Sequence, residues 1–190
     1  MAMATAKTID PDAIPIVDIG QLRDGSDPGA VAAALHAASQ RLGFIYIRGH
    51  GIPKSAIDAA RASAFGFFRA PEGDKETVRI SSRHRGWIGV GGAKMCDEAT
   101  ADLKESFVWG YQNADGSAPA DHPLRGENQW PAALPDLEAH AMRYFHHAHD
   151  VARHLMRGFA LGLDRDEDFF LRTADRPLSR ASFVYYPAQP

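Results

Sequence analysis

The first hydrophobic segments of the chain predict a strand, a helix and a second strand. Residues 14–19 (Ile-Pro-Ile-Val-Asp-Ile) are typical of a short strand, in which proline is tolerated near the beginning. After the N-capping candidates Ser26 and Asp27, apolar residues follow helical spacing at Val31, Leu35, Ala38 and Leu42. Residues 44–47 (Phe-Ile-Tyr-Ile) show no polar alternation, which is typical of a strand buried on both faces. This order predicts a βαβ-like unit.

Periodic apolar positions also predict two more helices and two more strands. A helix is expected over residues 54–68, and a longer one from residue 135 or 136 to about residue 161. In both segments apolar residues recur every three or four positions, which gives each helix one side to bury. The β-branched and aromatic residues of 106–109 and of 182–186 predict strands.

Glycines, prolines and capping residues predict the connections. Four glycines within residues 86–92 indicate a flexible or tightly turned loop, and the prolines and glycines of residues 112–135 indicate an extended loop. Residues 164–167 (Asp-Arg-Asp-Glu) form a plausible capping box for a short helix that holds Phe169 and Phe170. No linker that would separate two independent domains is evident.

Composition excludes several classes of protein. The 190 residues include 45% hydrophobic and 24% charged residues, as in an ordinary folded chain. A formal net charge of -3 gives no electrostatic reason to expect nucleic acid or an anionic membrane as a partner. The apolar runs are too short to cross a bilayer. The single cysteine, Cys96, excludes an internal disulfide and favours a cytoplasmic location, and an ordinary loop residue is a better interpretation of it than a reactive thiol.

Seven segments resemble, in the same order, the signature motifs of one protein family. The matching segments are residues 14–19 ("IPxIDL"), 42–52 ("GFFxVxNHGI", with Gly49 in place of asparagine), 67–75 ("FFxLPxExK"), 85–87, 102–107, 128–131 and 185–190 ("YYPxxP"). Individually each match is weak, but together they extend over nearly the whole chain. The family that they resemble is that of the isopenicillin N synthase-like iron(II)- and 2-oxoglutarate-dependent oxygenases.

This resemblance implies an α+β fold. A helical and mixed α/β N-terminal part would flank a jelly-roll (double-stranded β-helix) barrel that is mostly absent from this chain. Residues 14–135 would form the non-haem dioxygenase N-terminal domain, and residues 136–190 would supply a long helix and the first strand leading into the barrel. The missing barrel segment would follow in a longer gene product or come from another chain.

The resemblance also implies the cofactors of the complete enzyme, iron(II) and 2-oxoglutarate. Family members hold iron with His-x-Asp and a distant second histidine. None of the nine histidines here is followed two positions later by Asp or Glu. We therefore expect no catalytic residue, no metal ligand and no bound cofactor in this chain alone, which would not be catalytically competent. The complete enzyme would hydroxylate, desaturate or cyclise a small organic substrate.

Four residues remain as candidates for binding in the complete enzyme. By resemblance, Tyr186 would reach the cosubstrate, although it could equally fill the barrel wall. His84 and Arg85 lie where some relatives recognise a substrate carboxylate, but a solvated loop is the simpler interpretation. Val108 could touch substrate from its strand or belong to the core. Lys104 and Glu105 are interpreted as structural, as an ion pair at a strand end.

Two other interpretations stay open. The chain could be a stand-alone, non-catalytic binding or interaction module derived from the same fold. His147, Asp150 and His154 lie nearly in line on the predicted long helix and could bind zinc or nickel. Three nearby arginines would repel a cation, so a solvated helix flank is favoured there: Arg143, Arg153 and Arg157.

Overall fold

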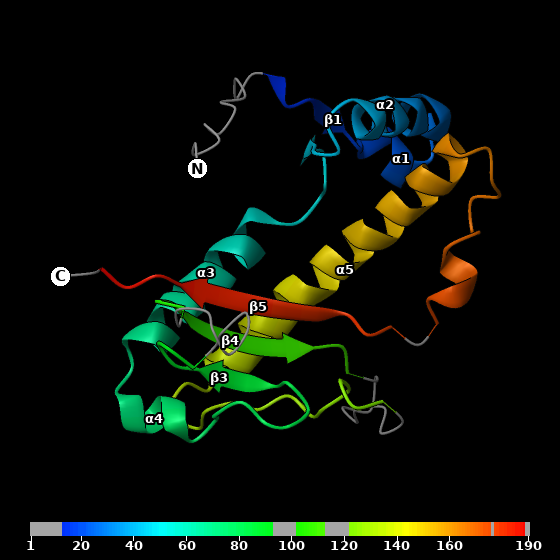
Figure 1. Cartoon of the computed structure of the whole chain (residues 1–190). Coiled ribbons are helices and arrows are strands. Elements are labelled where there is room, and N and C mark those ends of the chain that lie inside the picture. The colour runs from blue at the N-terminus through cyan, green and yellow to red at the C-terminus, as the bar shows by residue number, and fades with distance from the viewer. Residues whose placement is uncertain (1–12, 93–101, 113–121, 176, 189–190) are drawn as a thin grey trace, which may run out of the picture. The chain divides into compact units, whose positions relative to one another are not determined.

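A computed structural model describes residues 13–92, 102–112, 122–175 and 177–188 (Figure 1). Cys96 lies outside these residues. The chain divides into two compact units, and each is described by itself. Unit 1 comprises residues up to Gly51 together with Asp150–Asp175, and unit 2 comprises Ile52–His149 together with the residues from Arg176 onward.

Unit 1 contains the predicted βαβ arrangement. Strand β1 (Ile16–Asp18) pairs in parallel with β2 (Tyr46–Arg48), and α2 (Pro28–Arg41) connects them after the short helix α1 (Gly20–Asp24). The side chain of Asp27 caps α2 by accepting a hydrogen bond from the Ala30 N–H at 3.0 Å, so the predicted start of this helix is confirmed. Helix α1 was not expected, because five residues are too few to show a periodic pattern.

The prediction that residues 44–47 form a strand buried on both faces is wrong. Strand β2 begins only at Tyr46, and Phe44 and Tyr46 are 71% and 57% exposed. Ile16, the partner of Tyr46 on β1, is also exposed. The described sheet of unit 1 has two strands, and Val17 is buried on one of its faces while Ile16 and Tyr46 lie on the other. A strand made of consecutive apolar residues is therefore not necessarily buried on both faces of its sheet.

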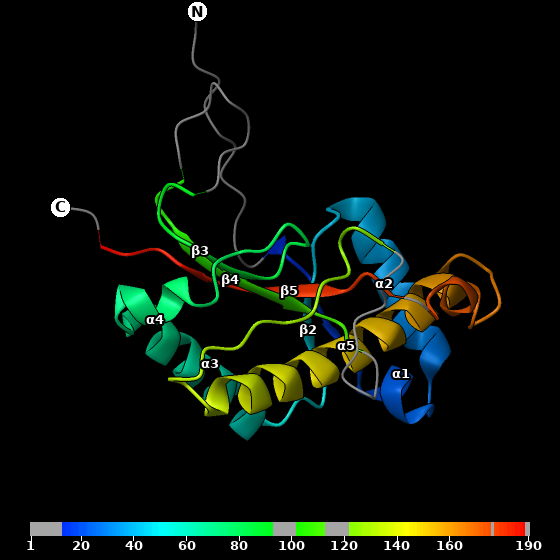
Figure 2. The same cartoon turned by 90° about the horizontal axis from the view of Figure 1, so that it is seen from below.

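Unit 2 is built on an antiparallel sheet of order β3-β4-β5 (Figure 2). The strands are β3 (Gly86–Ile88), β4 (Glu105–Gly110) and β5 (Arg180–Tyr185). Helix α3 (Lys54–Arg69), the short α4 (Glu72–Glu76) and the part of α5 (Asp136–Gly162) that precedes Asp150 lie on one side of this sheet. Both long helices and the last two strands confirm the predictions from periodicity.

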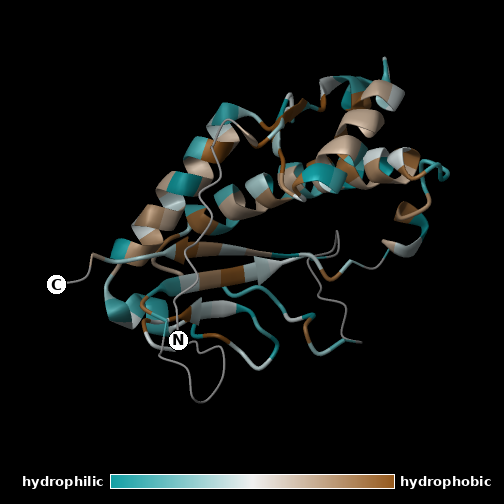
Figure 3. Ribbon diagram, turned by 45° about the horizontal axis from the view of Figure 1, so that its top comes forward, coloured by the Kyte–Doolittle hydropathy of each residue, from teal (hydrophilic) through white to brown (hydrophobic). Residues whose placement is uncertain are grey.

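The core of unit 2 lies between this sheet and these helices. Apolar residues line the buried sides of α3 and α5 and the middle of β4, as the hydropathy colouring shows (Figure 3). The buried residues of the core are Phe67, Phe68, Val78, Trp87, Phe107, Trp109, Leu137, Ala141 and Phe145. Packing of aromatic rings dominates it, for example between Phe67 and Phe107, whose ring centres are 4.6 Å apart.

Two expectations for the connections are wrong. Residues 86–88 form β3 and not part of a loop, because Trp87 pairs with Phe107 and fills the core. The capping box at residues 164–167 does not begin an α-helix. Turns follow instead, and a single 3-10 turn at Leu171–Thr173 ends the segment. Among the described residues, no helix is long and apolar enough to cross a membrane.

Candidate functional site

The face of the unit 2 sheet that lies opposite its core is the candidate site. Side chains alternate between two faces along a strand, and Trp87, Phe107 and Trp109 take the core face. The strand register therefore places a second set of residues together on the opposite side, which we call the open face: Gly86, Ile88, Ser106, Val108, Gly110, Arg180, Ser182 and Val184. Its β5 residues are exposed, so this side of the strand is accessible to a ligand.

A groove on the core side offers less chemistry. It has a volume of about 380 Å³ and lies between α3 and β5, beside Phe65 and Phe183. Arg61 is the one charged residue among the described residues that line it. The groove is mainly apolar, and its polar lining residues are Arg61, Tyr144, Ser182 and Tyr185.

The structure brings two of the predicted substrate residues to one end of the open face. Val108 pairs with Gly86 on one side and with Ser182 on the other, and its side chain is half-buried. Arg85 immediately precedes β3 and is only 1% exposed. A Cβ atom at Gly110 would lie 2.5 Å from Nη2 of Arg85, so the guanidinium covers this glycine. The interpretation of Arg85 as a solvated loop residue is therefore wrong.

Arg85 is buried without a carboxylate partner among the described residues. Its Nη1 donates a hydrogen bond to the carbonyl of His84 at 3.1 Å, whereas its Nε has no partner. Arg180, which pairs with Gly110 in the sheet, adds a second positive charge nearby. Burial, and then the field of Arg180, lower the pKa of Arg85 below its usual value. This end of the open face thus holds positive charge that has no carboxylate partner among the described residues.

Of the other two candidates, His84 adjoins Arg85 and contacts it through its backbone carbonyl, whereas Tyr186 lies apart. His84 is exposed in a turn, where its backbone has a φ of 58° and its N–H donates to the Ser81 carbonyl at 2.9 Å. Tyr186 follows β5 and is 71% exposed. Strand alternation places it beyond the opposite end of the open face, where its electrostatic influence reaches Lys104. The structure therefore does not bring Tyr186 and Arg85 into contact.

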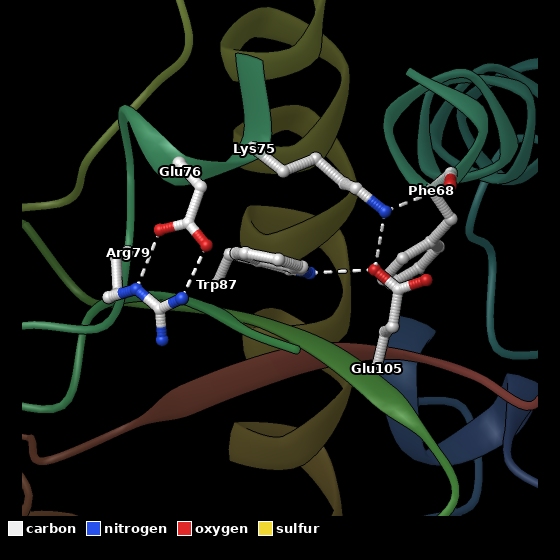
Figure 4. Close-up of polar contacts among 6 residues, drawn as sticks. All are labelled: Phe68, Lys75, Glu76, Arg79, Trp87 and Glu105. Carbon is white, nitrogen blue, oxygen red and sulfur yellow. Dashed lines mark hydrogen bonds and ion pairs between the residues drawn. The ribbon is translucent and has the colours of Figure 1, made fainter. Parts of the chain in front are cut away.

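A buried charged cluster supports β4 from the core side, and sequence reasoning missed it (Figure 4). Oε2 of Glu105 accepts hydrogen bonds from Nζ of Lys75 at 2.7 Å and from Nε1 of Trp87 at 2.8 Å. Lys75 and Glu105 are both buried, and the ammonium group of Lys75 also lies 5.1 Å from the centre of the Trp87 ring. This cluster links α4, β3 and β4, and thereby fixes the strands that carry the open face.

The expected ion pair between Lys104 and Glu105 is wrong. Lys104 pairs instead with Asp102, at 2.8 Å. Adjacent residues of a strand point to opposite faces, so Lys104 and Glu105 could not share one environment. The signal for the cluster was present in the sequence, because Glu105 lies two and four positions before Phe107 and Trp109 and therefore faces the core with them. An acid at a core position needs a buried partner.

The histidines of α5 do not form a metal centre. In the described parts of the chain, no three His, Cys, Asp or Glu side chains lie close enough together to hold a metal ion. His147, Asp150 and His154, which were considered as zinc or nickel ligands, are therefore not assembled for that purpose. Iron(II) likewise has no set of three such ligands among the described residues.

His154 instead predicts a pH dependence of stability. Its Nδ1 lies 3.0 Å from Nη1 of Arg157. Burial lowers the pKa of His154, the nearby Asp150 raises it, and Arg157, Arg23 and Arg153 lower it further. In the unfolded chain this imidazole takes up a proton near its ordinary pKa of 6.5, before the folded form does. The neutral imidazole thus stabilises the fold above that pH, and this contribution is lost as the pH falls toward the folded pKa.

Urea unfolding of the wild type and of His154→Gln between pH 7.5 and pH 5.5 measures this effect. These pH values are about one unit on either side of the ordinary histidine pKa. We expect the free energy of unfolding to fall more steeply with acidification in the wild type than in the variant. Equal slopes would show that the environment of His154 does not perturb its protonation.

Comparisons with known proteins agree with this architecture. Residues 14–133 match the family model described as "non-haem dioxygenase in morphine synthesis N-terminal". The chain is 29% identical to the 2-oxoglutarate-Fe(II) type oxidoreductase hxnY of Emericella nidulans, over 95% of this chain and 54% of that protein. It is 28% identical to the validamycin A dioxygenase of Streptomyces hygroscopicus subsp. limoneus, over 92% of this chain and 50% of that protein.

A solved structure shows the same fold. The crystal structure of a putative 2OG-Fe(II) oxygenase family protein from Caulobacter crescentus is 26% identical and matches with a TM-score of 0.79. The match covers 94% of this chain and 57% of that one. The chain thus spans about half the length of the relatives it matches. The match to the family model extends over more than half of the chain, and the chain therefore belongs to the non-haem dioxygenase N-terminal family, whose relatives here are 2-oxoglutarate- and iron(II)-dependent oxidoreductases.

Proposed function

We propose that this chain forms the N-terminal part of an iron(II)- and 2-oxoglutarate-dependent oxygenase that acts on a small organic substrate. The observation that carries the proposal is the open face of the unit 2 sheet, with a buried arginine at one end, in a chain of this family. In this proposal residues 14–135 are the N-terminal domain, and residues 136–190 lead into a jelly-roll barrel. The barrel segment completes the sheet beyond β5.

The cofactors belong to the complete enzyme in this proposal. Iron(II) and 2-oxoglutarate would supply the oxidising chemistry, and the described residues of this chain do not offer the ligands for iron. Tyr186 is proposed to contact the cosubstrate, since it lies on the open-face side just after β5. The remaining tasks of this chain are to bind, orient and enclose the substrate.

Arg85 is proposed to bind a carboxylate of the substrate. A buried guanidinium is unfavourable when, as among the described residues, it has no counter-charge, and a bound carboxylate would remove that penalty through charge-assisted hydrogen bonds. Arg180 would strengthen the same attraction from β5. Val108 would contact the apolar body of the substrate beside this group, and His84 would lie at the rim of the site.

Oxygen consumption tests the proposal. With iron(II) and 2-oxoglutarate, the 190-residue chain is expected to consume no oxygen above a control with metal alone. The reading frame past the codon for Pro190 is expected to encode a His-x-Asp pair. The longer product should then convert 2-oxoglutarate into succinate and carbon dioxide. Turnover by the 190-residue chain itself would contradict the proposal, and an intact stop codon with a soluble, monodisperse chain would favour a stand-alone binding module.

A further inference from the structure

Strand β4 extends past the end of β3, and at Gly110 a side chain takes the place of the neighbouring strand. Strand β3 pairs with β4 only from Gly86 opposite Val108 to Ile88 opposite Ser106. Asn128 takes the next place. Its Oδ1 accepts a hydrogen bond from the Gly110 N–H at 2.8 Å, and its Nδ2 donates one to the Gly110 carbonyl at 2.9 Å. The amide of Asn128 therefore pairs with this peptide as a neighbouring strand would.

Gly110 needs this support because of Arg85. A Cβ atom at position 110 would lie 2.5 Å from Nη2 of Arg85 and 2.8 Å from the backbone carbonyl oxygen of Ser179, so any other residue would displace the guanidinium and crowd the backbone. Glycine also leaves a strand end conformationally free, since it has the largest backbone entropy to lose on folding. The two hydrogen bonds between the Asn128 amide and the N–H and carbonyl of Gly110 fix the backbone of this residue, against which the guanidinium of Arg85 lies.

The side chain of the next residue, Gln129, holds the backbone of Arg85. Nε2 of Gln129 donates hydrogen bonds to the carbonyl of Arg85 at 2.5 Å and to the carbonyl of Arg79 at 3.2 Å. Two consecutive side chains thus fix the peptide of Gly110 and the peptide of Arg85. Together they fix the backbone from which the Arg85 side chain extends and the backbone against which its guanidinium lies.

We infer that Asn128 and Gln129 are positioning residues that hold Arg85 at its place on the open face. The inference rests on the proposed substrate role of Arg85, but it concerns residues that act through Arg85 and do not touch substrate. Loss of either side chain should leave the sheet paired while the guanidinium becomes mobile. The effect should therefore be visible at Arg85 itself.

Hydrogen exchange of the Arg85 Nε–H tests the inference in the ¹⁵N-labelled 190-residue chain. Its resonance is assigned by its loss in Arg85→Lys. In Asn128→Ala, exchange at this site is expected to accelerate about tenfold or more, as for the loss of two ordinary hydrogen bonds. Gln129→Ala should also accelerate it. The amides of Phe107 and Phe183 report the β4–β5 pairing and should change by no more than about twofold.

Two further variants act as matched tests. Asn128→Asp keeps the acceptor for the Gly110 N–H but sets a carboxylate oxygen against the Gly110 carbonyl in place of the donor, so exchange at Arg85 should accelerate as it does in Asn128→Ala. Gln112→Ala removes a second partner of Asn128 Nδ2, at 2.6 Å, and should leave Arg85 unaffected. If Asn128→Ala does not fold, Asn128→Asp and Gln129→Ala provide the same comparison. Unchanged exchange at Arg85, or acceleration in proportion to the whole sheet, would overturn the inference.

A titration with sodium octanoate separates this inference from the proposed function. In the wild type, octanoate but not the neutral octanamide should shift the Arg85 Nε–H resonance. In Asn128→Ala the octanoate affinity should be about tenfold weaker. If octanoate binds both proteins equally, the inference fails while the proposed role of Arg85 stands. If the wild type does not respond to octanoate, that role fails, and the exchange rates still decide whether Asn128 and Gln129 position Arg85.

Discussion

Glu105→Ala is expected to lower the free energy of unfolding by about 3–5 kcal/mol, the range for removing one partner of a buried ion pair. The carboxylate of Glu105 is the shared acceptor for Lys75 and Trp87 in the core of unit 2. Its removal leaves a buried ammonium group without a counter-charge and an indole N–H without an acceptor. Urea unfolding followed by tryptophan fluorescence measures the change.

Two controls give this result its meaning. Lys54→Ala removes an exposed ion pair with Asp58 and should change the free energy of unfolding by no more than about 0.5 kcal/mol. The double variant Lys75→Met/Glu105→Leu replaces both charges with apolar groups and should recover much of the loss. A loss below about 1 kcal/mol in Glu105→Ala, the value of an ordinary hydrogen bond, would show that the cluster does not stabilise the core.

Gly86→Ala is expected to cost at least about 3 kcal/mol of unfolding free energy, from backbone strain together with a lost hydrogen bond. Gly86 has a φ of 116°, and an added Cβ would lie 2.3 Å from the backbone carbonyl oxygen of Val78. That carbonyl accepts a hydrogen bond from the Trp87 N–H at 2.7 Å, so relief of the collision breaks this contact. Thermal and urea unfolding measure the loss.

A second glycine gives the opposite expectation. Gly66 lies in α3 with open space around the position of a Cβ atom. Gly66→Ala should therefore raise the free energy of unfolding by about 0.5–1 kcal/mol, the helix propensity difference between the two residues. If Gly86→Ala were as well tolerated as Gly66→Ala, the described backbone at Gly86 would be incorrect.

The fold was predictable where an element is long enough to repeat its pattern. Helices α3 and α5 show many apolar positions at helical spacing, and their extents agree with the structure within a few residues. Helices α1 and α4 have five residues each, too few for periodicity. Strand β3 was not predicted because it begins at Gly86 and more glycines follow it, while the pairing that makes it a strand comes from β4, later in the sequence.

The candidate site was less predictable because it depends on which residues meet. The sequence pointed to Arg85 and Val108, but it could not place them on one face, since the register of β3, β4 and β5 decides that. Arg180 becomes a candidate for the site only because it pairs with Gly110 in the sheet, which the sequence alone does not show. The burial of Arg85 and the hydrogen bonds of Asn128 likewise arise from tertiary packing.

The interleaving of the two units along the chain has a consequence for the order of folding. Unit 1 joins residues up to Gly51 with Asp150–Asp175, and unit 2 joins Ile52–His149 with the segment that contains β5. Each unit must therefore bring together segments from distant parts of the polypeptide, which slows folding because chain closure precedes the stabilising contacts. During synthesis on the ribosome, the pairing of β4 with β5 must wait until the last residues of β5 have emerged. Neither unit can be excised by a single cut, so isolating one of them requires a circular permutation or an internal deletion.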